Sequence, residues 1–140
     1  MKKVLPVFKT PISTYPHTAN LASILWENKK IYPWLMNCFI KPVGWEYRNM
    51  DYEDFYILDC PAILFERMGR DLINKGWNNI ISFIKDAIDS EYYLYLVVNT
   101  GEIEAYGYTP PNPHDMFIYG YDDEQKLVYI ADCSPEQQFS

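Results

Sequence analysis

The sequence contains few cysteines, and their spacing excludes the usual cysteine-based frameworks. The 140 residues include Cys38, Cys60 and Cys133, an odd number without the paired spacing of metal ligands. A disulfide framework and a zinc site are therefore not expected, and we predict no metal and no other cofactor. Each cysteine is expected to be a small buried apolar residue.

Basic residues are also scarce in this sequence. It contains 12 Lys and Arg residues against 19 Asp and Glu residues, which gives a formal net charge of −7. Lys2-Lys3 and Lys29-Lys30 are its basic pairs, and both are expected to be solvated surface features. Because phosphate binding requires clustered Lys and Arg, the composition argues against a nucleic-acid partner.

Long hydrophobic runs are missing as well. No run of about 18 apolar residues occurs, which argues against a membrane-spanning helix. The segment from Met1 to Pro6 is basic but lacks the apolar stretch of a signal peptide. We therefore predict a cytoplasmic protein without a membrane partner.

Aromatic residues, in contrast, are abundant, with 13 Tyr, 4 Trp and 7 Phe. A tyrosine offers a flat apolar face and one hydroxyl that needs a partner. These residues indicate either a tyrosine-rich core and surface or the wall of a ligand groove. The length suits one domain with its own core, so a single domain over residues 1–140 is predicted.

The first part of the chain is predicted to be extended and then helical. Residues 1–16 contain three prolines, which favour an extended segment. A first helix is expected to begin at His17 or Thr18, with Thr18 as a candidate N-cap, and to end near Trp26. A second helix is expected from Pro33 to Phe39, because proline suits the first helical turn.

Two further helices are predicted in the middle of the chain. Residues 62–74 place apolar side chains on one helical face, and Gly76 is expected to end this helix at a positive φ. The next helix is expected to be capped by Asn78 or Asn79 and to run through Asp89. Its apolar residues recur at intervals of three and four, the clearest periodicity in the sequence.

Strands follow the helices. Residues 92–99 are apolar on both alternating faces, which predicts a central strand that is buried on both sides. Residues 113–122 and 126–132 predict two strands joined by a short acidic turn. Helices first and strands last favour an α+β fold, with helices packed on an antiparallel sheet.

A histidine and a carboxylate lie at the ends of these two strands. His114 opens the first strand and Asp132 follows the second, so antiparallel pairing brings them toward the same end of the sheet. A carboxylate that holds an imidazole in one tautomer makes it a better general base. Asp122 is a weaker candidate for this role, since it suits the start of the turn. A purely structural histidine is the alternative.

The chain resembles the papain-like cysteine peptidase superfamily. The resemblance lies in a helix-rich first half, then His114, a Gly-Tyr-Asp turn at residues 120–122, and Tyr-Ile-Ala-Asp at residues 129–132. It is greatest to bacteriocin-leader peptidases and to the N-terminal domain of butirosin biosynthesis protein H, and it covers mainly residues 92–132. It implies a papain-like fold and an amide-forming acyltransferase or peptidase, with a peptide or an acyl carrier as partner.

The same resemblance implies a cysteine nucleophile at the start of the first helix. A helix N-terminus lowers the pKa of a thiol and offers N–H groups to an oxyanion. Pro16 and His17 stand in this region instead, and it contains no cysteine. The nearby hydroxyls of Ser13 and Thr14 would need stronger activation than a thiol.

The cysteines elsewhere are poor replacements for this nucleophile. Cys38 and Cys60 are expected to be buried, and Cys133 follows Asp132, whose charge disfavours a thiolate. Three hypotheses follow. The chain is an acyl-transfer enzyme in which His114 is the base and Asp132 orients it, or a degenerate relative that binds a peptide or carrier protein without catalysis. In the third, it is an acidic α+β domain for protein contacts.

Overall fold

The structure is a computed structural model, and its helices and antiparallel sheets confirm the predicted α+β class. The chain divides into two compact units. The sheet unit comprises Met1–Val7 and Arg67–Ser140, and the helical unit comprises Phe8–Glu66. The structure describes residues 1–12, 16–39, 42–44, 50–52, 60–107 and 110–131.

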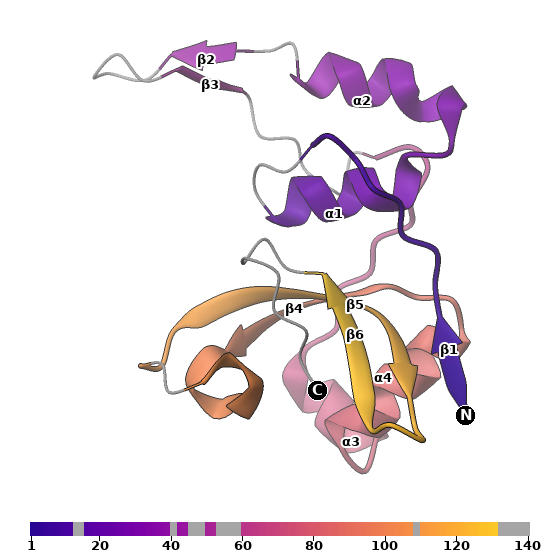
Figure 1. The fold of residues 1–140 in the computed structure, drawn as a ribbon, viewed down its shortest axis with the longest axis vertical. Helices are drawn as coiled ribbons and strands as arrows, with labels where there is room; N and C mark the ends of the chain where they lie inside the picture. The colour runs from indigo at the N-terminus through magenta and orange to yellow at the C-terminus, as the bar shows by residue number, and fades with distance from the viewer. Residues whose placement is uncertain (13–15, 40–41, 45–49, 53–59, 108–109, 132–140) are drawn as a thin grey trace. The chain divides into compact units, whose positions relative to one another are not determined.

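The sheet unit is built around one long strand, β5, to which three other strands pair in antiparallel fashion (Figure 1). β4 pairs with β5 from Pro113 to Ile118, and β1 pairs with its last residues. β6 returns along β5 through the predicted acidic turn, which confirms the two-strand prediction. The strands are β1 (Lys2–Val4), β4 (Leu94–Asn99), β5 (Pro113–Asp122) and β6 (Leu127–Ala131).

The prediction that residues 92–99 form a central strand is wrong. Within the described residues, β4 pairs with β5 alone and is therefore an edge strand. Its side chains Leu94, Leu96 and Val98 pack against the core, whereas Val97 is 65% exposed. An apolar sequence indicates that a strand is buried, but it does not indicate how many other strands pair with it.

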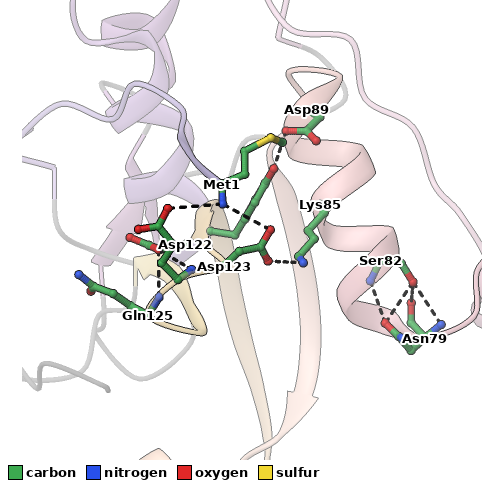
Figure 2. Close-up of polar contacts among 10 residues, drawn as sticks. Met1, Asn79, Ser82, Lys85, Asp89, Asp122, Asp123 and Gln125 are labelled. Atoms are coloured by element: carbon green, nitrogen blue, oxygen red, sulfur yellow. Dashed lines mark hydrogen bonds and ion pairs between the residues drawn. The ribbon is translucent and has the colours of Figure 1, made fainter.

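Helix α4 (Ile80–Asp89) forms as the sequence predicts. The side chain of Asn79 accepts a hydrogen bond from the Ser82 N–H at 2.8 Å, and the Asn79 N–H donates to the Ser82 hydroxyl oxygen at 3.3 Å (Figure 2). This capping box satisfies N–H groups that have no partner within the helix. Phe83, Ile84 and Ile88 form the buried face of the helix.

Helix α3 is shorter than the pattern predicts and spans Arg70–Gly76. Residues 62–69 are not helical, and Leu64, counted as part of an apolar face, is 92% exposed. The expectation of a positive φ at Gly76 is also wrong, because among the described glycines Gly107 has the positive φ, at 72°. The extended residue Trp77 ends the helix instead, and its N–H donates to the Ile73 carbonyl at 3.0 Å.

The core of the sheet unit lies between α4 and one face of the sheet. Tyr93, the residue before β4, links the N-terminal segment to this core, because its hydroxyl donates to the Pro6 carbonyl at 2.6 Å. The Leu5 N–H likewise donates to the Tyr119 carbonyl at 2.7 Å. The buried core residues are Leu5, Phe83, Ile84, Ile88, Met116, Ile118 and Tyr121.

The helical unit contains α1 (Pro16–Leu25), α2 (Tyr32–Phe39) and a hairpin that the sequence did not predict, β2 (Pro42–Gly44) with β3 (Met50–Tyr52). The second helix is therefore confirmed. Thr18 is not the N-cap of α1, because the helix already begins at Pro16. Thr18 lies within the first turn, where its side chain is fully buried and its Oγ1 has no hydrogen-bond partner in the described structure.

Among the described residues, no helix is both long and apolar enough to cross a membrane.

Candidate functional site

His114 lies at the second position of β5, directly opposite Val98 of β4. Side chains alternate along a strand, so His114 shares a face with the buried Met116 and Ile118. The imidazole is half-buried, and the ring of Tyr106 meets it edge-on, with 5.7 Å between the ring centroids. His114 is therefore held at the rim of the core, where one side of its ring packs against an aromatic group.

The loop before β5 is hydrogen-bonded to the residue that follows β4, and this contact positions His114 at the start of β5. The N–H of Thr100 donates to the Asn112 carbonyl at 3.1 Å, and the Thr100 hydroxyl lies 3.3 Å from the same oxygen. Thr100 is buried, and Asn99 caps the short 3-10 turn that follows by accepting from the Gly101 N–H at 3.1 Å. His114 comes two residues after Asn112 and is paired with Val98 of β4.

The contacts of Tyr106 and Thr100 with this segment were not predicted from the sequence. Tyr106 ends a 3-10 turn that begins at Glu104, and Gly107 follows at a positive φ. A glycine adopts this backbone conformation without steric cost. The glycine favours a turn at this place, but the sequence does not indicate that this turn brings Tyr106 against His114.

The predicted partner of His114 comes directly after the last described strand residue. β6 ends at Ala131, which is opposite Phe117 in the same half of β5 as His114. The pairing therefore brings the end of β6 toward the end of the sheet where His114 lies. Asp132 itself is outside the described residues.

Asp122 lies at the opposite end of β5 and has a structural role there. Its Oδ1 accepts hydrogen bonds from the N–H groups of Glu124 at 3.0 Å and Gln125 at 3.1 Å, and Lys2 Nζ lies 3.5 Å from Oδ2. Hydrogen bonds from Gln125 and Glu124 and the charge of Lys2 hold the pKa of Asp122 below its usual value. The prediction that Asp122 begins the turn is confirmed.

A second polar cluster connects this turn with α4. Lys85 forms an ion pair with Asp123 (Figure 2). The Tyr121 hydroxyl donates to Asp89 Oδ1 at 2.9 Å, and the Lys85 ammonium lies 5.7 Å from the centre of the Tyr121 ring. Burial, followed by the hydrogen bond to Asp89, raises the pKa of Tyr121 to about 12. This cluster joins α4 to the sheet and lies away from His114.

The raised pKa of Tyr121 predicts a loss of stability at alkaline pH. The folded chain keeps this proton up to about pH 12, whereas an unfolded tyrosine releases it near pH 10. The contribution of Tyr121 to the free energy of unfolding is therefore complete below pH 10 and is lost as the pH rises toward 12. Urea unfolding across this range is expected to show that wild type loses stability relative to Tyr121→Phe. Tyr92→Phe, at an exposed tyrosine, is expected to follow wild type.

The candidate nucleophiles lie in different parts of the chain. Cys60 is buried in an apolar cluster with Leu21, Leu25 and Ile31, as predicted. The start of α1 carries Pro16 and a half-exposed His17, and belongs to the helical unit, whereas His114 belongs to the sheet unit. Ser13, Thr14 and Cys133, and the side chain of Cys38, lie outside the described residues.

Within the described residues, no group of three His, Cys, Asp or Glu side chains is arranged to hold a metal ion. Comparisons with protein-family models, with curated proteins and with solved structures find no match to this chain.

Proposed function

We propose that this chain is a papain-like acyl-transfer protein of the cytoplasm, an amide-forming acyltransferase or a peptidase, with His114 as the general base. Asp132 orients the imidazole, and the substrate is a peptide or an acyl group on a carrier. The observation that carries the proposal is the β5–β6 pairing, which brings the strand end before Asp132 to the end of the sheet that holds His114. The resemblance of residues 92–132 supports the same assignment.

Direct transfer to a substrate amine fits these residues best, because it needs a base but no protein nucleophile. The amine attacks the carbonyl carbon of an acyl thioester, and His114 takes the proton that the nitrogen must lose. The C–S bond then breaks, and the departing thiolate receives that proton from the imidazolium. A carboxylate at Asp132 would hold the second ring nitrogen as an N–H donor and would stabilise the imidazolium.

The alternative is a degenerate papain-like module that binds a peptide or carrier protein without catalysis. One observation favours it: Cys60, the cysteine whose side chain is described, is buried among apolar residues. In addition, the helix start at Pro16 carries no thiol. A binding module would need its cleft but neither a nucleophile nor a base.

The test compares His114→Ala and Asp132→Asn with wild type, using an acyl-pantetheine thioester and a primary amine. Amide formation above the uncatalysed rate is expected for wild type, and His114→Ala should lower it by about 10²- to 10⁴-fold. Asp132→Asn should also lower it, because the imidazole loses its orienting charge. His17→Ala is the matched control, since it removes the other histidine and should leave the rate unchanged.

Equal rates for wild type and His114→Ala would rule out a base at this position. Absence of turnover in all variants, together with binding of the thioester, would instead support the binding module.

A further inference from the structure

Within the described residues, no strand pairs with the outer edge of β4, and the strand lacks the features that usually protect such an edge. Natural edge strands are commonly kept from pairing by a lysine, a proline, a bulge or a very short length. β4 has six residues, Leu-Tyr-Leu-Val-Val-Asn, without charge or proline. Its pairing with β5 runs from Leu94 to Asn99 without a register shift. Within the described residues, β5 is its single strand partner.

One exposed apolar side chain of β4, Val97, lies on the face away from the core. Leu94, Leu96 and Val98 pack against the core of the sheet unit, so the alternate residues lie on the other face. Val97 on that face is 65% exposed. A strand added beside β4 would cover Val97 while it gains main-chain hydrogen bonds from the edge.

The charge around this edge is negative. Between Lys85 and Lys126 the sequence contains no Lys or Arg. Glu91, which is exposed, precedes β4, and the exposed residues Glu102 and Glu104 follow it. Asp115 lies opposite Val97 on β5. Both ends of the strand therefore present carboxylates to whatever pairs with it.

We propose that the outer edge of β4 is a strand-addition site for an extended peptide segment with apolar side chains in its middle and Lys or Arg at its ends. The main-chain bonds would supply affinity, and Val97 would contact the apolar residues. The basic ends would meet the carboxylates of Glu91, Glu102 and Glu104.

A second copy of this chain fits the same edge less well. In an antiparallel pair of two β4 strands, the start of one strand lies beside the end of the other. Glu91 of each copy would then approach Glu102 and Glu104 of its partner, and like charges placed together disfavour association. A basic peptide converts the same carboxylates into attractive contacts.

The test measures binding of a fluorescent peptide of alternating valine and threonine residues with lysines at both ends. Wild type is expected to bind it. Val97→Lys should weaken binding about tenfold or more, because it sets a charged side chain against the apolar middle of the peptide. Val97→Thr should retain binding. Val4→Lys is the matched control: it places the same charge on another exposed valine of an edge strand, β1, and should leave the affinity unchanged.

Two further comparisons make the result independent of how well Val97→Lys folds. The combined variant Glu102→Gln and Glu104→Gln should weaken binding and reduce its salt dependence. A peptide whose central amides are N-methylated cannot donate strand hydrogen bonds and should not bind. Equal binding of the methylated peptide, or no binding of the parent peptide to wild type, would overturn the proposal.

Analytical ultracentrifugation of wild type and Val97→Lys tests whether a second copy of this chain binds at the edge. A monomer in both cases agrees with a peptide site. A wild-type dimer that becomes monomeric in Val97→Lys would assign the edge to a second copy and would overturn the peptide proposal. These measurements record binding rather than turnover, so their outcome is separate from that of the His114 experiment.

Discussion

Gly120→Ala is expected to lower the free energy of unfolding by about 3 kcal/mol, although it adds a single methyl group. Gly120 lies in β5 where β1 and β6 both pair with it. A Cβ at this position would lie 2.8 Å from the Lys3 carbonyl oxygen, 3.0 Å from the Val4 Cα and 3.2 Å from Cδ2 of the Tyr129 ring. The first two are backbone atoms, which cannot move aside as the end of a flexible side chain can.

Relief of this contact would require β1 to move away from β5. Lys3 and Val4 pair with Tyr121 and Gly120, and the next residue, Leu5, is bonded to β5 and buried in the core. The added methyl group therefore disturbs both the pairing of β1 with β5 and the packing of Leu5 in the core.

Urea denaturation monitored by circular dichroism measures this effect. Gly76→Ala is the matched control, because nothing lies within 4 Å of a Cβ at that position and its φ is not positive. It should be neutral or slightly stabilising, since alanine loses less backbone entropy on folding than glycine. Equal midpoints for Gly120→Ala and wild type would show that β1 does not approach β5 this closely.

Ile88→Ala is expected to lower the free energy of unfolding by about 2–5 kcal/mol. Ile88 is fully buried in the last turn of α4 and belongs to the core between this helix and the sheet. Its truncation removes apolar contacts and leaves a cavity that a close-packed interior closes only in part. The change should therefore weaken the attachment of α4 to β5.

Ile80→Ala in the same helix separates this effect from helix propensity. Ile80 is 49% exposed at the first position of α4, so its truncation should cost less than about 1 kcal/mol. Both substitutions replace isoleucine with the best helix former, and only the burial differs. Similar losses in the two variants, measured by thermal and urea unfolding, would contradict the position of α4 on the sheet.

The sequence alone determined the elements whose signals are local. A cap at Asn78 or Asn79 followed by an apolar stripe predicts α4, because a cap and a periodicity of three and four act within the helix itself. The acidic turn after Asp122 predicts the β5–β6 hairpin, because its hydrogen bonds join residues that are neighbours in the chain. This hairpin also allowed His114 to be placed at the start of a strand.

Only the tertiary structure decided the features that depend on distant residues. The pairing of Lys2–Val4 with the end of β5 joins residues from opposite ends of the sequence, and no local pattern encodes it. The sequence of β4 indicated burial, but its place at the edge depends on whether another strand lies beside it. Likewise, Tyr106 reaches His114 through a turn whose direction is set by long-range packing. Local hydrogen bonds and periodicity can be read along the chain, whereas strand order and ring contacts depend on which surfaces meet after folding.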